Sequence, residues 1–354
     1  MTQAEPPAYH YLRDLYGQPA SLIDSYAGLV EQWPVLLEAG AWLRERPYVF
    51  IVGIGSSYNA ALALERYLAD HGRLVKVIDA SELAYAPQLF PAAGYIIASR
   101  SGASVEIVRI VQRCQEAGIP IVAVTNAPES PLAQAAHFSI EMRSVFDHQI
   151  SLRMYTVMVQ TLLVLGHTIC EAETPFPGET LVQSVTATRD RIRTWQFQIE
   201  KNDFFGPGHV YYMLGRGVNL SGAHAARLLM EEAAKTSATV MPTGAFRHGP
   251  QESLSRQSHI VIWLPNDVPL RGHDLELAAS IEDRGGQCMV IGQGLQARDV
   301  AALTIDLPTM PPYLQPIVDI VPVQLGAYVH ALCTGKDPDV LIHCPYVVTT
   351  EGGL

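Results

Sequence analysis

The sequence predicts an α/β protein built from two doubly wound parallel sheets. Short apolar runs alternate with helical patterns along the 354 residues, as expected when parallel strands are covered by helices on both faces. This alternation also starts twice, because "VFIVGIG" (49–55) and "VYYMLGRG" (210–217) are both strand-like runs that end in Gly-x-Gly. We therefore interpret the two halves as subdomains related by an internal repeat.

The first half carries five apolar runs bounded by turn residues, each of strand length. They predict strands at 48–53, 76–79, 95–99, 120–126 and 137–142. Between them, patterns such as "SYNAALALERYLADHG" and "SVEIVRIVQRCQEAG" predict helices that stop on or near a glycine. A further apolar run at 155–170 is too short to span a bilayer and includes Gln160 and His167, so it predicts a buried helix.

The second half repeats this organisation after a helix of mixed charge, predicted at roughly 178–201. Its apolar runs predict strands at 210–217, 237–241, 259–265, 287–292 and 302–308. The stretch "SGAHAARLLMEEAAKTS" (221–237) predicts a helix with a face of small residues.

Composition narrows the class of protein and of partner. Charged residues make up 17% and hydrophobic residues 48%, which indicates a well-buried globular chain. The net charge of −11, without a basic stripe, argues against a nucleic-acid partner. The five cysteines show no CxxC spacing, so we expect reduced, mostly buried thiols. The N-terminus lacks the apolar run of a signal peptide, so we expect a cytoplasmic protein with no membrane partner.

Two hydroxyl-rich stretches follow predicted strands of the first half, where an open parallel sheet binds its ligands. One is "GIGSSY", with Ser56 and Ser57, and the other is "SRSGAS", directly before a helix. A helix N-terminus with Ser and Gly offers backbone N–H groups, hydroxyl donors and the positive end of the helix dipole. The alternative for a single serine is an ordinary helix cap. Two clusters on neighbouring strand ends favour phosphate binding by Ser56, Ser57, Ser99, Arg100, Ser101 and Ser104.

Other ligand motifs are absent from the sequence. "GIGSSY" lacks the third glycine of the dinucleotide fingerprint, and neither the P-loop pattern nor G-x-S-x-G occurs. No His/Cys spacing indicates a metal site. We therefore expect neither a metal nor another cofactor.

The second half carries candidate acid–base residues. Glu232 shares a helix face with Ala225 and Leu229, and a partly buried carboxylate there has the raised pKa of a proton shuttle near neutral pH. For its neighbour Glu231 we expect a solvent-facing side chain. Sixteen residues after Glu232 comes His248, in the glycine-flanked "TGAFRHGP". A carboxylate and a histidine around one pocket suit ring opening and proton transfer on a sugar.

Taken in order, these motifs resemble the tandem sugar isomerase (SIS) domain family. The resemblance is to the isomerase half of glucosamine-6-phosphate synthase, to amino-sugar-phosphate deaminases and to fructosamine-6-phosphate deglycases. It covers nearly the whole chain, through "YLRDLYGQPASL", "GIGSSY", "SRSGAS", "VTNAPESPLAQAAH", "LGRG", "FRHGP", "DRGG" and "PIVDIVPVQLGAYVHALCTGKDPD". No counterpart of the synthase's amidotransferase domain is evident, so glutamine-dependent synthesis is not expected.

The resemblance implies roles for particular residues. The family's phosphate loop falls on Ser99, Arg100, Ser101 and Ser104, with Ser56 and Ser57 contributing. Its catalytic glutamate falls on Glu232, and its ring-opening histidine falls on His248. In the family that histidine comes from the second subunit, so the resemblance implies a homodimer with His248 shared across the interface.

The sequence also departs from the family's pattern. Tyr346 in "YVVTTE" stands at the tail lysine, and Leu229 stands at a lysine of the catalytic helix. Ala245 replaces a glutamate, and in the phosphate loop Arg100 and Ala103 replace a glutamine and a glutamate. The segment "SVFDHQISLRMYT" is longer than the family's loop, and its Arg153 takes the place of a lysine. These changes disfavour lysine-dependent chemistry and point to an unusual substrate.

The resemblance implies a phosphosugar-active enzyme, an isomerase or an isomerising amino-sugar-phosphate deaminase, working through an enediol or enolamine. A fructosamine-phosphate deglycase and a non-catalytic sugar-phosphate-binding protein remain alternatives. The ligand expected is a phosphorylated sugar or amino sugar. The expected organisation is a lead-in helix (1–25), a first SIS domain (26–175), a linker helix (176–203), a second SIS domain (204–340) and a C-terminal tail (341–354).

Overall fold

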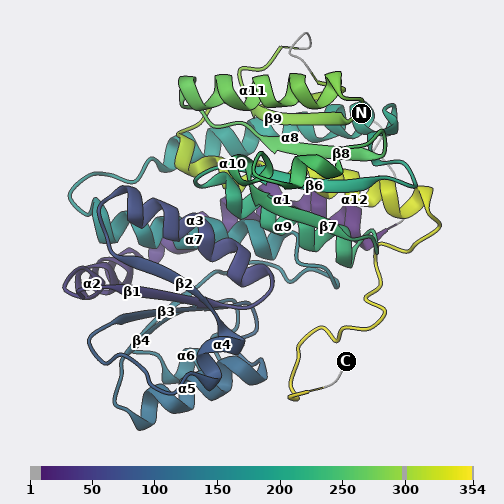
Figure 1. Ribbon diagram of the computed structural model, residues 1–354. Coiled ribbons are helices and arrows are strands. Elements are labelled where there is room, and N and C mark those ends of the chain that lie inside the picture. The colour runs from purple at the N-terminus through teal and green to yellow at the C-terminus, as the bar shows by residue number, and fades with distance from the viewer. Residues whose placement is uncertain (1–8, 297–300, 353–354) are drawn as a thin grey trace, which may run out of the picture. The chain divides into compact units, whose positions relative to one another are not determined.

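The computed structural model describes residues 9–296 and 301–352 (Figure 1). Contacts divide the chain into two compact units, each containing one sheet. The first-sheet unit comprises Ala20–Phe146, Arg153–Glu179 and Ile342–Leu354, and the second-sheet unit comprises Met1–Pro19, Asp147–Leu152 and Thr180–Leu341. The C-terminal tail thus belongs to the first-sheet unit. The domain limits expected from the sequence stay a prediction.

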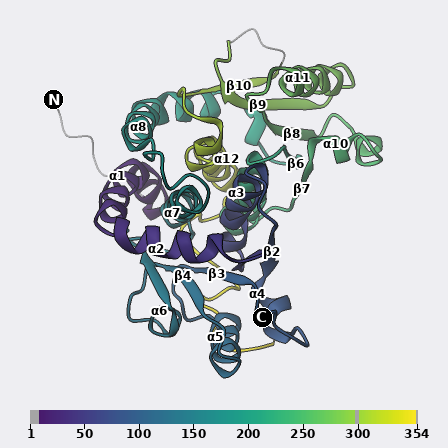
Figure 2. The ribbon, with the colours of Figure 1, turned by 90° about the vertical axis from the view of Figure 1, so that its left-hand side faces the viewer.

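The first-sheet unit holds five parallel strands between two layers of helices, as Figure 2 shows. The strand order is β2 (Val75–Asp79), β1 (Val49–Gly53), β3 (Gly94–Ser99), β4 (Ile121–Thr125) and β5 (Phe138–Glu141). One layer contains α2 (Trp33–Arg44), α3 (Ser56–Asp70) and α7 (Arg153–Cys170). The other contains α4 (Ala80–Tyr85), α5 (Val105–Glu116) and α6 (Pro131–Ala135).

The second-sheet unit repeats that strand order with its own five parallel strands. They are β7 (Ala238–Pro242), β6 (Val210–Gly215), β8 (Ser258–Trp263), β9 (Gln287–Gln293) and β10 (Leu303–Leu307). Its α-helices are α8 (Gly178–Glu200), whose first two residues belong to the other unit, α9 (Asn219–Glu232), α10 (Thr243–Phe246), α11 (Val268–Asp283) and α12 (Val321–Cys333). Its described residues also form three short 3-10 helices, at Asp203–Phe205, Pro250–Ser253 and Pro312–Ile317. The predicted α/β class with two doubly wound parallel sheets is confirmed, and all ten predicted strands are present.

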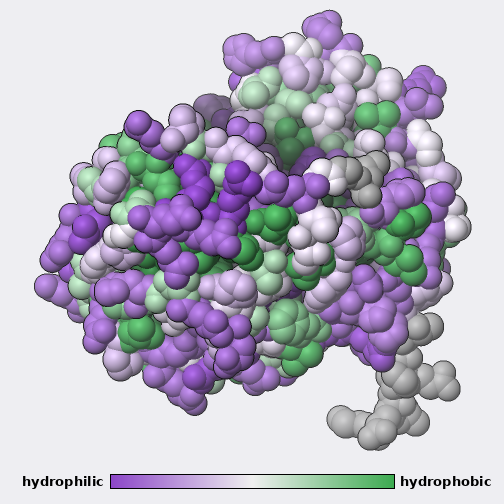
Figure 3. All heavy atoms as spheres, turned by 90° about the horizontal axis from the view of Figure 1, so that it is seen from below, coloured by the Kyte–Doolittle hydropathy of each residue, from purple (hydrophilic) through white to green (hydrophobic). Residues whose placement is uncertain are grey.

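Successive residues of a strand point to opposite sides of the sheet, and helices bury the side chains on both sides. In the first-sheet unit Tyr95, Ile97 and Ala123 face α4, α5 and α6. In the second-sheet unit Ile260 and Ile262 join the cluster beneath α10 and α11. Most large apolar side chains are buried in these cores. The face shown in Figure 3 is largely hydrophilic with scattered hydrophobic groups.

Helix α1 (His10–Glu31) runs beyond residue 25, where the lead-in helix was expected to end, and residues 1–8 lie outside the described part. Pro19 lies inside the helix. A proline cannot donate to the carbonyl four residues earlier, here that of Leu15. The Gln18 side-chain amide donates to Leu15 O instead, at 3.2 Å. This replacement bond explains why Gln-Pro does not end the helix.

Two expectations are wrong. The helix predicted at 221–237 ends at Glu232, because Lys235 adopts a left-handed backbone (φ 52°) and Thr236 N donates back to Met230 O. The cysteines are all free, but only Cys114 and Cys288 are buried. Cys170 is intermediate, and Cys333 and Cys344 are exposed because they lie near or beyond the end of the last helix.

The described residues contain one segment, Pro312–Cys333, that is long and apolar enough to cross a membrane by length and composition. Within its most apolar stretch, 83% is buried inside the protein. The segment includes α12, which packs against α9 in the second-sheet unit. Burial of α12 in this unit explains why the segment is apolar. The predicted buried helix at 155–170 corresponds to α7, which is buried along nearly its entire length.

Candidate functional site

The two hydroxyl loops expected to bind phosphate lie at one edge of the first sheet. Ser56 and Ser57 follow β1, and the stretch 99–104 ends β3 and leads into α5. Strands β1 and β3 are hydrogen-bonded neighbours and run parallel, so their carboxyl ends meet at the same edge. The structure therefore places Ser56, Ser57, Ser99, Arg100, Ser101 and Ser104 on adjacent loops of one unit.

The loop after β1 is tight. A Cβ at Gly53 would lie 2.7 Å from the backbone carbon of Ser57, so only glycine lets the start of α3 approach the strand this closely. Gly55 then turns the chain with a φ of 57°. Ser57 is buried, whereas Ser56 is partly exposed at the mouth of the loop.

The loop after β3 is organised by its own hydroxyls. Ser99 Oγ accepts a hydrogen bond from Gly102 N at 3.0 Å, and Ser101 Oγ accepts one from Ala103 N at 3.4 Å. Both bonds use the oxygens as acceptors, so each hydroxyl hydrogen is left to donate. Gly102 has a φ of 60°, and a Cβ there would lie 2.2 Å from Ser130 Oγ. The loop therefore depends on glycine for both its backbone conformation and its space.

Ser104 occupies the N-cap position of α5 but does not cap the helix with its side chain. Its hydroxyl is buried and has no hydrogen-bond partner among the described residues. A buried hydroxyl without a partner carries a desolvation penalty, which a ligand that accepts its hydrogen would remove. The simple capping role, which was the alternative for this serine, is thus not what the structure shows.

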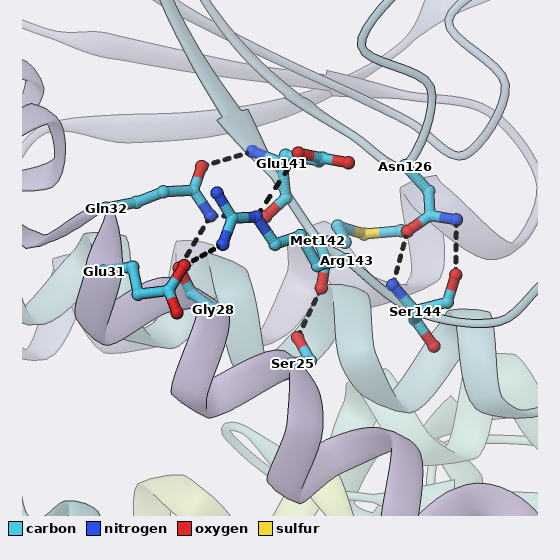
Figure 4. A network of polar contacts seen from close by, with 9 residues as sticks. All are labelled: Ser25, Gly28, Glu31, Gln32, Asn126, Glu141, Met142, Arg143 and Ser144. Atoms are coloured by element: carbon cyan, nitrogen blue, oxygen red, sulfur yellow. Dashed lines mark hydrogen bonds and ion pairs between the residues drawn. The ribbon is translucent and has the colours of Figure 1, made fainter.

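The backbone of Arg100 is held from the neighbouring strand. Its carbonyl accepts hydrogen bonds from Thr125 Oγ1 at 3.3 Å and from Asn126 N at 3.2 Å. Asn126 is fixed in turn by a reciprocal pair with Ser144, in which each of the two hydrogen bonds measures 2.8 Å (Figure 4). Asn126 lies in "VTNAPESPLAQAAH", so the signal for this support was present in the sequence although no role was assigned to it.

Figure 4 shows that the same polar network continues to the end of α1. Gln32 exchanges two hydrogen bonds of 2.9 Å with the backbone of Glu141, and Ser25 Oγ donates to Met142 O at 2.6 Å. Arg143, in a left-handed backbone (φ 50°), pairs with Glu31 and Glu141. The carboxyl ends of β4 and β5 are therefore rigidly supported beside the hydroxyl loops.

The side chain of Arg100 meets the C-terminal tail. Its Nη2 donates to Tyr346 O at 2.5 Å, and its guanidinium carbon lies 3.9 Å from the centre of the Tyr346 ring. Val105 N, at the start of α5, donates to Val348 O at 3.0 Å. Arg100 and Tyr346 are two separate departures from the family's pattern, and their contact was not predicted from the sequence.

Glu232, the predicted proton shuttle, is the last residue of α9 and is partly exposed. The expected inward packing of Ala225 and Leu229 on this helix is confirmed by their burial. Burial raises the pKa of the Tyr11 phenol well above its usual value, and the negative charges of Glu232 and Asp147 raise it further. Glu231, by contrast, forms an ion pair with Arg227, one helical turn earlier in α9.

Lys235, to which no role was assigned from the sequence, lies just beyond Glu232. The Lys235 ammonium donates to Ala233 O at 3.2 Å and to Asp337 O at 2.7 Å. Burial lowers its pKa, and the charge of Glu232 is among those that partly offset this effect. Leu229, Tyr346 and Arg153 stand at the positions where the family has lysines, and Lys235 is none of these. Lys235 supplies an amine to the same end of α9 from a different position.

His248, the predicted ring-opening residue, is exposed in the loop between α10 and the turn Pro250–Ser253. Phe246 anchors this loop: it is fully buried and packs edge-on against Tyr212, with ring centroids 5.4 Å apart. Gly249, with a φ of 128°, reverses the backbone directly after the histidine. Among interactions between described residues, the His248 imidazole has no partner, so the ring is presented to the surroundings.

The corresponding edge of the second sheet is built differently. Asp267 caps α11 by accepting from Leu270 N at 3.1 Å, which places a carboxylate where an anionic ligand would have to bind. Arg216, after β6, is engaged by the buried Asp274 through two bonds of 2.9 and 3.0 Å. Hydroxyl donors for phosphate are therefore concentrated on the first sheet.

Comparison with known proteins places these loops in a family. The model of the SIS domain matches residues 43–169, which include both hydroxyl loops. Glutamine–fructose-6-phosphate aminotransferase (isomerizing) of Pyrobaculum aerophilum is 28% identical over 96% of this chain. The chain spans 57% of the length of that relative.

Two solved structures share the fold over nearly their whole lengths. Glucosamine-6-phosphate deaminase of Thermotoga maritima matches with a TM-score of 0.81 and 20% identity, covering 96% of this chain and 99% of that one. Tagatose-6-phosphate ketose/aldose isomerase of Escherichia coli matches with a TM-score of 0.80 and 20% identity, covering 97% and 99%. The hydroxyl loops, the parallel sheet that carries them and the family match together show that residues 43–169 of this chain are a SIS domain.

Proposed function

We propose that this protein is a cytosolic enzyme that acts on a phosphorylated sugar or amino sugar, as an isomerase or an isomerising deaminase. The observation that carries the proposal is the edge of the first sheet, where two hydroxyl loops meet and the buried Ser104 Oγ has no partner. A phosphate oxygen would accept its hydrogen, together with those of Ser99 and Ser101. The names of the similar proteins, a deaminase and an isomerase of sugar phosphates, support the same substrate class.

In the proposed mechanism the phosphate anchors the substrate and two side chains move protons. His248 opens the sugar ring: it gives a proton to the ring oxygen as the bond from that oxygen to the anomeric carbon breaks, and the anomeric hydroxyl gives its proton to solvent water. Glu232 then takes the C2 proton and returns it at C1 through an enediol, or an enolamine where C2 carries an amine.

We also propose a homodimer in which His248 serves the partner's site. The supporting observation is that the imidazole is exposed and has no partner among the described residues. A side chain presented in this way is suited to completing a site on another molecule, and a two-fold dimer would complete both sites at once.

Exchange of the C2 proton with solvent tests the enzymatic proposal. In D₂O the wild-type protein is expected to incorporate deuterium at C1 of fructose 6-phosphate or at C2 of glucosamine 6-phosphate, observed by NMR. Glu232→Gln should abolish the exchange, because the amide cannot take the proton, and should leave phosphate binding intact. Exchange with release of ammonia from the amino sugar would identify a deaminase. Binding without any exchange in the wild type would contradict the proposal and identify a sugar-phosphate-binding protein.

A further inference from the structure

Two separate departures from the family's pattern meet in this structure. Arg100 stands where the resembled family has a glutamine in its phosphate loop, and Tyr346 stands where that family has a tail lysine. The residues are 246 positions apart in the chain, yet the Arg100 guanidinium stacks on the Tyr346 ring. Relative to the family's pattern, the tail therefore lacks one positive charge, and the loop that it contacts has an additional one.

The geometry of the contact leaves most of the guanidinium available. Its central carbon lies over the Tyr346 ring, 3.9 Å from the ring centroid, and Nη2 donates to Tyr346 O at 2.5 Å. A guanidinium has five N–H donors, all directed outward in its plane. The donors other than the one directed at Tyr346 O have no partner among the described residues.

The tail is attached to the site at further points. Val348 O accepts from Val105 N, the first backbone N–H of α5, at 3.0 Å. Glu351 pairs with Arg109 at 3.1 Å, one turn farther along the same helix. These contacts keep the tail along the start of α5, beside the buried and unpartnered Ser104 Oγ. The Tyr346 ring therefore has a defined place from which to hold Arg100.

We propose that Tyr346 is a positioning residue of the phosphate site: its ring and carbonyl hold the Arg100 guanidinium at the loop so that its free edge binds the substrate's phosphate. The inference rests on the proposed function and adds a charge to what the hydroxyls supply. An unsupported arginine would lose rotamer entropy on binding the phosphate, and the stacked arginine has already lost it. Arginine also suits this task because its planar donors match phosphate oxygens in pairs.

This arrangement predicts energetic coupling between Arg100 and Tyr346. The test measures binding of glucose 6-phosphate to the full-length protein by calorimetry, for the wild type, Arg100→Gln, Tyr346→Ala and the double variant. Arg100→Gln should weaken binding about tenfold, by loss of a charge-assisted bond. Tyr346→Ala should weaken it about threefold in the wild type, and less than about 1.5-fold in the Arg100→Gln background, because the ring acts only through the arginine.

Conservative and remote variants separate positioning from mere folding. Tyr346→Phe keeps the ring and is expected to restore most of the affinity that Tyr346→Ala loses. Phe197→Ala removes an exposed ring beneath Lys201 in the second-sheet unit, a matched cation–ring pair away from the loops, and should not change the affinity. Both Arg100→Gln and Tyr346→Ala should flatten the dependence of affinity on salt, since each removes or disorders a charge that faces the phosphate.

The outcomes distinguish this inference from the proposed function. Equal losses from Tyr346→Ala in both backgrounds would overturn the inference, because the tail would then act independently of Arg100. Full affinity in Arg100→Gln would also overturn it and would leave the hydroxyl site standing. If the wild type bound glucose 6-phosphate no better than glucose, the phosphate site itself would be refuted, and the proposed function with it.

Discussion

Ser104 shows how a single buried hydroxyl can indicate a ligand. It stands at the N-cap of α5, where serine ordinarily accepts a backbone hydrogen bond, yet its Oγ is buried without a partner. Such a group lowers stability in the free protein and gains a bond only when an acceptor arrives. The sequence pattern "SRSGAS" indicated the region, but only the structure separates this serine from Ser99 and Ser101, which already accept bonds within the loop.

Ser104→Ala should therefore have opposite effects on stability and on binding. Without ligand the variant is expected to melt at the same temperature as the wild type or slightly higher, because an unsatisfied buried hydroxyl is removed. Its affinity for glucose 6-phosphate should fall by on the order of 1–3 kcal/mol, the cost of a lost donor. Thermal melting with and without the ligand measures both. A lower melting temperature of the free variant, with unchanged affinity, would show that Ser104 is only structural.

Other site residues could not be derived from sequence alone. Glu232 and His248 were predicted from residue type and spacing, but no distance between groups follows from spacing. The contact of Arg100 with Tyr346 joins residues that are far apart in the chain, and no local pattern reports it. Lys235 was missed for a related reason: its position near Glu232 depends on a left-handed turn that a lysine seldom adopts.

At the scale of elements, the strands were predictable and the helix ends were not. Parallel strands buried on both faces appear in the sequence as continuous apolar runs, and all ten were predicted from this signal. The end of α9 depends instead on one backbone conformation, at Lys235, and the passage of α1 through Pro19 depends on one side-chain bond, from Gln18. A proline inside a helix costs about 3 kcal/mol and a left-handed non-glycine residue about 1–2 kcal/mol, and periodicity does not report the local contacts that offset such costs.

The turns after β1 and β3 offer a matched pair of glycine substitutions. Gly55 and Gly102 both have positive φ, 57° and 60°, but a Cβ at Gly55 meets open space while one at Gly102 collides with Ser130 Oγ at 2.2 Å. Gly55 combines its φ of 57° with a ψ of −126°, outside the left-handed helical region, so Gly55→Ala should cost about 2 kcal/mol of unfolding free energy from backbone strain alone. Gly102→Ala should cost about 3 kcal/mol or more, since the collision with Ser130 adds to its own backbone strain.

Urea unfolding of the two glycine variants, compared with the wild type, measures the difference directly. Phosphate binding by Gly102→Ala should weaken as well, because the displaced loop carries Ser99 and Ser101. Equal destabilisation of both variants would mean that Ser130 moves aside easily and that the loop is less constrained than its contacts indicate.

At the scale of the whole molecule, the proposed dimer predicts complementation. Glu232→Gln and His248→Ala should each be inactive as homodimers. Mixed by subunit exchange, they form a heterodimer in which one site keeps both native residues, so about half of the wild-type turnover per dimer should return. Activity of heterodimers isolated with two affinity tags is the measurement. A verified heterodimer that stays inactive would place both residues in one subunit's site.

The buried histidines of the second-sheet unit predict how the stability of the fold depends on pH. The rings of His209 and His259 stack with centroids 3.6 Å apart, and His259 Nδ1 bonds Phe204 O at 2.6 Å. Burial lowers the pKa of His259 to about 4; the Phe204 carbonyl and Asp203 oppose the shift, and His209 adds to it. The folded state therefore keeps this imidazole neutral while the unfolded chain, with a pKa near 6.5, takes up a proton.

The stability linked to His259 is thus fully present above about pH 7 and is lost as the pH falls from 6.5 towards 4. We expect this loss to amount to about 2 kcal/mol by pH 4.5, measured by urea unfolding of the second-sheet unit through the fluorescence of the buried Trp263. His259→Asn keeps a donor for Phe204 O but does not titrate. That variant should be less stable at pH 7.5, yet should lose less on acidification, so the two curves should converge at low pH. Parallel curves would mean that other groups, such as the buried His330, cause the acid sensitivity instead.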